Sequence, residues 1–203
     1  MEAARAAGKK VGIFRPITLW PFPERELLEL SKHARRILVA EHNYGQIVLE
    51  AERMAREGME PEAIVAALEA LTGRVEASFI LDRLDYMKMG GRCSAVTLLG
   101  ANLLKLRPCI EVKDGKMGVA KKYRGTFAKC LEAYIADRLA GRDDIELGRI
   151  FITHSGVPDE IIALAKSCIA KYQTFDEVCV TRAGCTVSSH CGPGTIGILF
   201  IRK

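Results

Sequence analysis

Apolar positions along the chain alternate between short buried-type runs and stripes with helical spacing, a pattern typical of alternating strands and helices. In the first part of the chain this pattern predicts a small βαβα segment, with strands at residues 10–15 and 36–41 and helices at residues 24–35 and 46–57. Gly58 can end the last of these helices. A further helix follows at once, since Pro61 suits a first helical turn and Gly73 stands where the apolar stripe ends.

From residue 75 onward the alternation continues and includes one hairpin. Strands are predicted at residues 75–81, 108–113, 117–122, 149–153, 177–181 and 196–201. Helices are predicted at residues 82–89, 95–104, 126–139 and 158–172, and a loop is predicted at residues 185–194. Asp114-Gly115 tolerates the positive φ angles of a tight turn and therefore joins two of the strands as a hairpin. The sequence thus predicts an α/β fold in which helices cover a mixed sheet.

A candidate domain boundary lies at residues 58–61, between the βαβα segment and the longer alternation. It divides the chain into a first domain at residues 1–58 and a second at residues 59–203. A chain of 203 residues is long enough for one full-sized core or two small ones, but the first segment is too short to fold reliably alone. We therefore expect the first segment to pack against the second.

Composition narrows the class of protein. The chain is 49% hydrophobic and 27% charged, as ordinary globular proteins are. No apolar run approaches the roughly 20 residues of a membrane span, and the N-terminus lacks the apolar core of a signal peptide. The net charge of +5 forms no basic stripe, so no nucleic-acid partner is expected. The seven cysteines are an odd number and sit mostly in apolar segments, which favours free thiols in a soluble, cytoplasmic protein.

The most informative chemistry is a histidine in a glycine-rich segment ahead of a predicted buried strand. His190 is followed by Gly192 and Gly194, with a proline between the two glycines. An imidazole there, together with freed backbone N–H groups, can hydrogen-bond a carboxylate. The competing interpretation is an ordinary turn histidine, and these residues alone do not decide between the two.

Two arginines stand in similar settings. Arg92 follows Gly90 and Gly91, and its guanidinium suits bidentate contact with a carboxylate or phosphate. Arg124 precedes a glycine at another strand-to-helix junction. Each is also explained as a solvated surface cation, Arg124 more readily than Arg92. Because all three segments follow strands or abut helix starts, where open α/β sheets place ligands, we expect their basic groups to converge on one anion.

Cysteines and histidines suggest two further kinds of site, neither of which is favoured. Cys179, Cys185, His190 and Cys191 offer zinc ligands, but their spacing fits no common structural zinc pattern, so no metal site is expected. A nucleophilic pair of Cys185 or Cys191 with His154 or His190 would make a cysteine-dependent enzyme. Neighbouring residues point apart in extended backbone, which speaks against a pair of His190 with Cys191.

Five motifs follow one another in an order typical of one bacterial family: FILDRLDYMKMGGR, IEVKDGK, KKYRG, FITHSG and SHCGPGTIGILF. Over residues 61–203 the chain resembles the C-terminal lobe of the DegV family of fatty-acid-binding proteins. The resemblance implies a non-catalytic protein without a cofactor that binds a long-chain fatty acid and presents it to a separate fatty-acid kinase. The residues that it implies in head-group or kinase contact are His190, Arg92 and Arg124, with loop backbone at Gly90, Gly91, Gly192 and Gly194.

The acyl chain of such a ligand needs an apolar pocket. At about 0.8 kcal/mol per buried methylene, a C16 tail offers roughly 10 kcal/mol gross, so chain burial dominates affinity and the paired carboxylate sets orientation. The candidate pocket residues are Phe79, Leu98, Leu99 and Leu103. Each of them is equally explained as part of an ordinary core.

The first segment carries a different resemblance. Through VGIFRPITLWPFP and RILVAEHNYGQ, residues 9–58 are similar to part of the C-terminal region of the alpha subunit of 2-oxoacid:ferredoxin oxidoreductases. This resemblance implies subunit contacts rather than catalysis, and the chain has no C-x-x-C motif for an iron-sulfur cluster. The alternative function is therefore a subunit-interaction fragment of such an oxidoreductase.

A complete DegV protein, by the same resemblance, has an N-terminal lobe whose serine and threonine hydroxyls bond the carboxylate. We expect this chain to lack that lobe, as a fused or truncated protein would. The surface that normally faces the missing lobe would then be exposed and partly apolar, which favours self-association.

Overall fold

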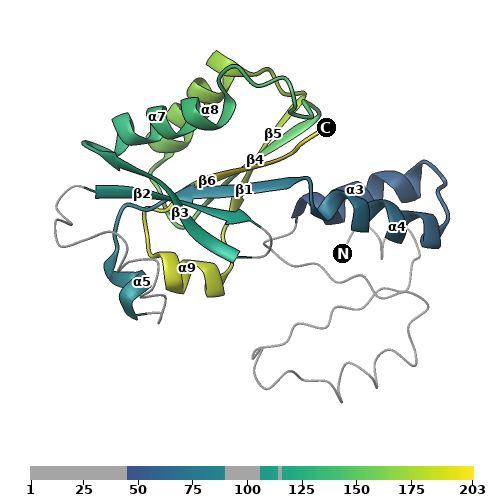
Figure 1. The fold of residues 1–203 in the computed structure, drawn as a ribbon, viewed down its shortest axis with the longest axis horizontal. Helices are drawn as coiled ribbons and strands as arrows, with labels where there is room; N and C mark the ends of the chain where they lie inside the picture. The colour runs from purple at the N-terminus through teal and green to yellow at the C-terminus, as the bar shows by residue number, and fades with distance from the viewer. Residues whose placement is uncertain (1–44, 90–105, 114–115) are drawn as a thin grey trace, which may run out of the picture. The chain divides into compact units, whose positions relative to one another are not determined.

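The computed structural model describes residues 45–89, 106–113 and 116–203 (Figure 1). The described strands are β1 (Val75–Ile80), β2 (Leu106–Lys113), β3 (Lys116–Arg124), β4 (Arg149–His154), β5 (Glu177–Arg182) and β6 (Ile196–Ile201). The described helices are α3 (Gly45–Arg56), α4 (Pro61–Thr72), α5 (Asp85–Met89), α7 (Phe127–Leu139), α8 (Asp159–Tyr172) and α9 (Cys185–Cys191). The elements predicted before residue 45, the helix predicted at residues 95–104 and the turn at Asp114-Gly115 lie outside the described residues.

The strands form one mixed sheet, as the alternating pattern predicts. Their order is β3-β2-β1-β6-β4-β5, so that β1 and β6 lie in the middle. β4 and β5 run parallel and are joined through α8, whereas the other neighbouring pairs are antiparallel. The pair of β2 and β3 is the predicted hairpin, with Val112 opposite Met117 near its turn.

Helices cover both faces of this sheet (Figure 1). α7 and α8 pack together on one face, and α5 and α9 lie in contact on the other. Side chains of β1 and the residue after it alternate between these faces. Ile80 belongs to the larger apolar cluster, which includes residues of α7 and α8, whereas Phe79 and Leu81 belong to a smaller cluster with residues of α5 and α9.

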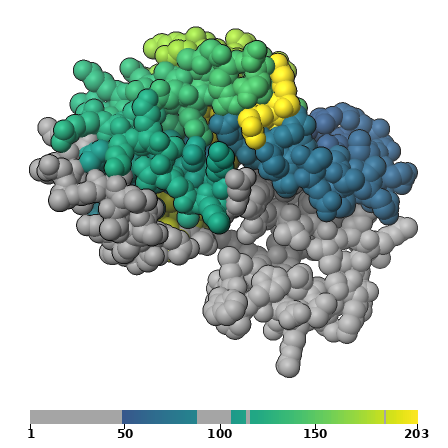
Figure 2. Space-filling view, viewed as in Figure 1, coloured from purple at the N-terminus to yellow at the C-terminus, as the bar shows by residue number. Residues whose placement is uncertain are grey.

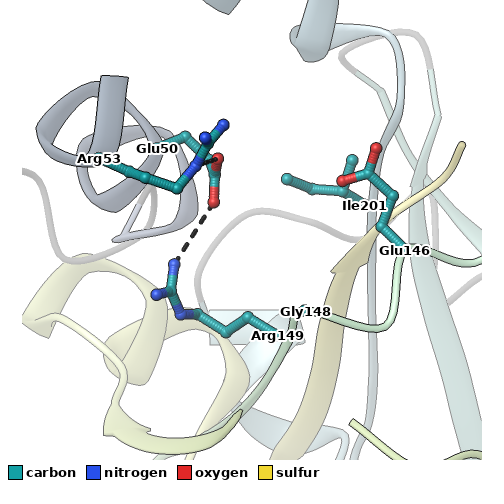
Figure 3. A pocket seen from close by; sticks show the side chains of 6 residues that line it. All are labelled: Glu50, Arg53, Glu146, Gly148, Arg149 and Ile201. Carbon is teal, nitrogen blue, oxygen red and sulfur yellow. Dashed lines mark hydrogen bonds and ion pairs between the residues drawn. The ribbon is translucent and has the colours of Figure 1, made fainter. Parts of the chain in front are cut away.

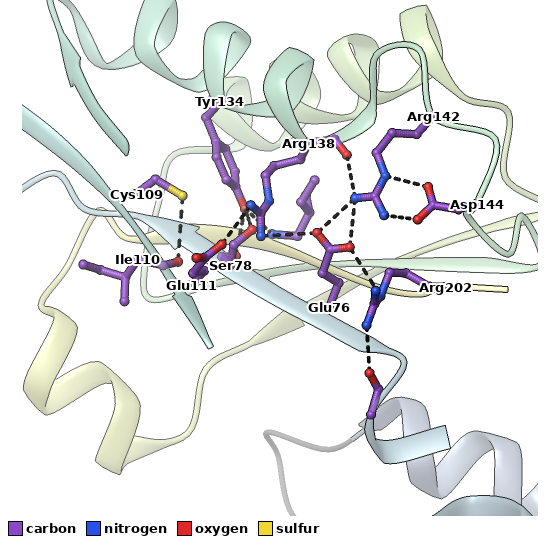
Figure 4. Close-up of polar contacts among 12 residues, drawn as sticks. Glu76, Ser78, Cys109, Ile110, Glu111, Tyr134, Arg138, Arg142, Asp144 and Arg202 are labelled. Carbon is purple, nitrogen blue, oxygen red and sulfur yellow. Dashed lines mark hydrogen bonds and ion pairs between the residues drawn. The ribbon is translucent and has the colours of Figure 1, made fainter. Parts of the chain in front are cut away.

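The hydroxyl of Tyr134, on α7, ties the helix to both central strands (Figure 4). It donates to the Ser78 carbonyl oxygen at 2.8 Å and accepts from the Ile198 backbone N–H at 3.1 Å. The Ser78 hydroxyl lies 2.9 Å away and donates to the same oxygen. The Tyr134 side chain is fully buried, and burial raises the pKa of its hydroxyl. A neutral, fully paired phenol therefore stands where α7, β1 and β6 meet.

A group of ion pairs surrounds this contact on the same face of the sheet (Figure 4). Arg142 makes two contacts to Glu76 of β1, at 2.8 and 3.0 Å, and two to Asp144, at 2.7 and 2.8 Å. Arg138 of α7 approaches Glu76 at 3.4 Å and Glu111 of β2 at 3.2 Å. The Asp144 contact is bidentate, whereas one Arg142 nitrogen bonds both Glu76 oxygens; together they fix the chain that leaves α7 against the start of β1.

α3 and α4 pack onto the end of the sheet where β6 finishes. Met54 from α3, Leu71 from α4 and Ile201 from β6 make a third apolar cluster. Glu50 of α3 also lies 3.4 Å from Arg149, at the start of β4. These contacts make the helix at residues 45–56 part of the same packed body as β4 and β6.

The last residues of the chain are held from both sides. The Arg202 N–H donates to the Arg74 carbonyl at 2.9 Å, and the Lys203 N–H donates to the Asp144 carbonyl at 2.8 Å. Figure 2 shows the C-terminal end of the chain, in yellow, between a green and a blue part of the surface. None of the helices in the described ranges is long and apolar enough to cross a membrane.

The predicted loop at residues 185–194 is wrong in its first part, because residues Cys185–Cys191 form the helix α9. Thr, Val, Ser and Cys have modest helix propensity, so local sequence does not predict a helix there. Tertiary packing overrides that preference, since Val187 and Cys191 contribute to the apolar cluster shared with α5. The other elements predicted within the described ranges are confirmed, with ends that shift by up to three residues.

Replacing Tyr134 with Phe removes the hydroxyl and leaves the Ser78 hydroxyl and the Ile198 N–H buried without their partner. We expect Tyr134→Phe to lower the free energy of unfolding by about 1–3 kcal/mol, measured by urea denaturation. Tyr172→Phe is the matched control, because Tyr172 is 39% exposed on α8 and should change stability little. Equal stability of the two variants would contradict this assignment.

Candidate functional site

Most of the described candidate residues lie at one end of the strands, where β1 and β4 finish and β6 begins. We call this end of the sheet the site edge. Ile80, the last residue of β1, pairs with Ile196, the first residue of β6, and Ile196 also pairs with His154, the last residue of β4. The segments that leave this edge therefore start side by side. The segment after β1 contains Asp82. The segment before β6 contains residues 192–194, called the glycine segment.

His190 stands in the last turn of α9, immediately before the glycine segment. Its Nδ1 atom is buried and has no hydrogen-bond partner among the described residues. A buried polar atom without a partner costs free energy unless a ligand or water satisfies it. This orphaned imidazole nitrogen is the strongest indication of a ligand contact at the edge.

Gly192 and Gly194 both have positive φ angles, of 78° and 80°, which favour glycine. Both also lie against residues that follow β1. A Cβ atom at Gly192 would stand 2.5 Å from the Tyr86 ring, and one at Gly194 would stand 2.9 Å from the Asp82 Cβ. The predicted role of these glycines as special loop backbone thus has a physical basis: only glycine allows this conformation and this approach.

Ser155, just after β4, holds the glycine segment from its other side. Its hydroxyl donates to the Gly192 carbonyl, and its carbonyl accepts the Gly194 N–H at 3.2 Å. The Ser155 N–H donates to the Thr195 carbonyl at 2.9 Å, and the Thr195 hydroxyl donates to the Cys191 carbonyl at 3.0 Å. The end of α9 is therefore fixed to β4 as well as to β6.

Arg124 ends the edge strand β3 and is exposed. Cys109 of β2 pairs with Ile80 and with Lys121, so β3 continues three residues, roughly 10 Å, past the end of β1. Within the described part of the chain, no hydrogen bond or ion pair engages the Arg124 guanidinium. The sheet thus places Arg124 beyond the same edge as His190, but three strands away from β6.

The remaining head-group and pocket candidates divide between described and undescribed residues. Phe79 lies in the apolar cluster of the face that α9 covers, together with Leu81 and Ile110. That position is compatible with an acyl pocket and with an ordinary core. The other candidates, Gly90, Gly91, Arg92, Leu98, Leu99 and Leu103, lie outside the described residues.

Neither of the two alternative chemistries gains support. The described residues contain no group of three or more side chains suited to hold a metal ion. Burial raises the pKa of the Cys191 thiol to about 11, whereas a nucleophilic cysteine needs a lowered pKa.

A separate hollow of about 290 Å³ lies at the opposite end of the sheet (Figure 3). Its lining includes Glu50, Arg53, Glu146 and Arg149. Arg53 and Arg149 both pair with Glu50, and Glu146 pairs with Arg74. Because its charges neutralise one another, this hollow offers no unpaired group for an anion.

The described residues form an α/β lobe in which an imidazole nitrogen without a partner among them and a glycine segment lie near an apolar cluster. The chain belongs to the DegV family: the family model described as "Uncharacterised protein, DegV family" matches residues 39–203. The resemblance seen in the sequence is thereby confirmed for the lobe, and the match extends further toward the N-terminus than residue 61.

Individual relatives agree with the family match. The chain is 32% identical over 162 residues to a fatty acid-binding protein of Thermotoga maritima, covering 75% of this chain and 54% of that protein. A solved structure described as fatty acid binding of a DegV family protein from Thermus thermophilus matches with a TM-score of 0.66 and 28% identity, over 90% of this chain and 66% of that one. This chain spans about half the length of the curated relatives it matches.

A third match has the same fold at low identity. It is the Streptococcus pneumoniae fatty acid kinase (Fak) B3 protein loaded with linoleic acid, with a TM-score of 0.68 and 17% identity, over 88% of this chain and 64% of that one. At this identity the match shows the fold alone.

The comparisons do not support the oxidoreductase resemblance of residues 9–58. The DegV match begins at residue 39, inside that segment, and α3 packs on Leu71 and Ile201 through Met54. Two short motifs were too little sequence to establish a second family. The division into domains at residues 1–58 and 59–203 stays a prediction.

Three residues that contact the glycine segment were not predicted from the sequence: Asp82, Tyr86 and Ser155. The first two lie within the motif FILDRLDYMKMGGR and the third within FITHSG, so motif position was the available signal. Their roles depend on contacts with the glycine segment, which only the folded chain brings to them.

Gly194→Ala tests how tightly the glycine segment is held. An alanine there would be strained by the positive φ, and its Cβ atom would lie too close to the Asp82 side chain. We therefore expect the free energy of unfolding, measured by urea denaturation, to fall by about 2–4 kcal/mol. Gly118→Ala on β3 is the control, since a Cβ atom there has nothing within 4 Å and φ is not positive. Similar unfolding midpoints for both variants would show that the close approach is absent.

His154 predicts a pH dependence of stability. Desolvation, and secondarily the nearby Arg182, lower its pKa, with Asp159 opposing them, and its Nδ1 accepts the Val157 N–H at 3.3 Å. The unfolded chain therefore takes up the proton first, and the stabilisation by neutral His154 is lost as pH falls below about 6.5. We expect the urea midpoint of the native sequence to fall more steeply between about pH 7.5 and 5.5 than that of His154→Gln. Parallel pH profiles would contradict this.

Proposed function

We propose that this lobe binds a long-chain fatty acid, with His190 contributing to the head-group contact and Phe79 to the wall of the acyl pocket. The observation that carries the proposal is the buried Nδ1 atom of His190, which has no partner in the described residues and lies at the edge of an apolar cluster. An imidazole suits a carboxylate, and the apolar side chains suit its tail. The names of the Thermotoga and Thermus relatives, which bind fatty acids, support the same ligand.

The proposed site includes the remaining predicted residues. Arg92 and Arg124 contribute to head-group or kinase contact, with loop backbone from Gly90 and Gly91. Leu98, Leu99 and Leu103 line the acyl pocket together with Phe79. The Arg124 guanidinium is exposed and has no ion pair among the described residues, which fits contact with a partner better than contact with a buried carboxylate.

We further propose a non-catalytic role in which the bound acid is presented to a separate fatty-acid kinase. The resemblance to the DegV family, which implies presentation to such a kinase, motivates this partner. To test this partner, the chain is added as the only carrier to such a kinase with labelled acid, and formation of acyl phosphate is measured.

The free cysteines in the described residues support a cytoplasmic location.

Self-association of the lobe through a partly apolar surface is a further part of the proposal. Native mass spectrometry of the purified protein reports both bound acid and oligomeric state.

The decisive experiment is a calorimetric titration of the delipidated chain with palmitic acid. We expect His190→Ala to weaken binding by about 10- to 100-fold, because a hydrogen bond to a charged group contributes about 1.5–3 kcal/mol. Ser189→Ala, an exposed position one residue earlier on α9, is the control and should bind as the native sequence does. No binding by the native sequence would refute the proposed function, and equal binding by His190→Ala would remove His190 from the site.

A further inference from the structure

Arg107, near the start of β2, contacts the segment that follows β1. One guanidinium nitrogen donates to the Asp82 carbonyl oxygen at 2.7 Å, and the other lies 2.9 Å from the Asp82 carboxylate. The guanidinium also stands 6.0 Å above the ring centroid of Phe127, at the start of α7. Its Nε is buried without a hydrogen-bond partner among the described residues, so the hydrogen bonds and ion pair found for the guanidinium there all go to Asp82.

Asp82 in turn supports the glycine segment. Its side-chain atoms lie 2.9 to 3.4 Å from the position that a Cβ atom of Gly194 would occupy. The backbone runs from Gly194 through Gly192 to His190 without a break, and Gly192 is pressed on the Tyr86 ring in the same way. Asp82 and Tyr86 therefore limit where the backbone that follows α9 can lie.

We propose that Arg107, acting through Asp82, is a positioning residue that sets the place of the His190 imidazole. This inference rests on the proposed head-group role of His190. Arg107 itself need not touch the ligand. It joins β2 to the segment between β1 and α5, and that segment packs against the glycine backbone that follows His190.

The geometry favours positioning over simple stabilisation. The Arg107 and Asp82 side chains are 22% and 35% exposed, and a partly solvated ion pair contributes little to the free energy of unfolding. Two simultaneous contacts to one residue, together with the Phe127 ring near the guanidinium, instead restrict the direction of the side chain. Lysine could keep the charge but not this planar double contact.

The test compares palmitic acid with hexadecanol on the delipidated full-length chain. The two ligands share their tail, so a head-group effect changes the ratio of their affinities, whereas a general structural effect lowers both. We expect Arg107→Gln to reduce the preference for the acid about tenfold, with the alcohol affinity and the urea midpoint nearly unchanged, and Arg107→Lys to recover part of the preference. Arg56→Gln, in an exposed ion pair on α3, should leave the preference intact. Equal losses for acid and alcohol, or no loss, would overturn the inference.

A second measurement separates this inference from the proposed function. In the ligand-free chain, the ring-nitrogen NMR signals of His190 should shift in both Arg107→Gln and Asp82→Asn, while those of His154 stay in place. If the native sequence binds no acid but these shifts occur, the proposed function is wrong and the positioning contact stands. If the native sequence binds acid and His190 is unperturbed in both variants, the positioning contact is wrong and the function stands.

Discussion

The Tyr134 hydroxyl joins α7 to the two central strands, and the candidate site inherits its geometry from that contact. Because one phenol oxygen serves Ser78 of β1 and Ile198 of β6, neither strand can shift along the other without leaving a buried polar group unpaired. Gly197 reinforces the constraint, since a Cβ atom there would stand 2.4 Å from the Ser78 carbonyl oxygen. The central pair therefore has one permitted register.

That register decides what can meet at the sheet edge. With Ile80 level with Ile196, the segment after β1 and the segment before β6 leave the sheet next to each other. Asp82 then lies on Gly194, and the end of α9 is held between this contact and Ser155, which follows the neighbouring strand β4. A slip of one residue would turn every side chain of β6 to the other face and would separate these contacts. The precision of the site thus comes from the middle of the sheet rather than from the loop sequence.

Sequence reasoning succeeded where local pattern determines structure and failed where distant contacts do. The period of apolar residues and the placement of glycine and proline were enough for β6, α4 and α8. They were not enough for α9, whose helix depends on packing against α5, nor for Arg107 and Asp82, which lie 25 positions apart in the chain. Motifs identified the lobe correctly over most of its length, but short motifs near the N-terminus suggested a family that the comparisons do not support.

The position of β6 has a consequence for how the lobe is made in the cell. β6 is the last strand to be synthesised, yet it lies between β1 and β4, with Val75 opposite Ile201. On a ribosome, β1 waits on the order of ten seconds for this partner, at typical rates of chain elongation. Until then, both strands present open edges to chaperones and to other nascent chains. The two parts of the sheet on either side of β6 therefore join only once β6 has left the ribosome.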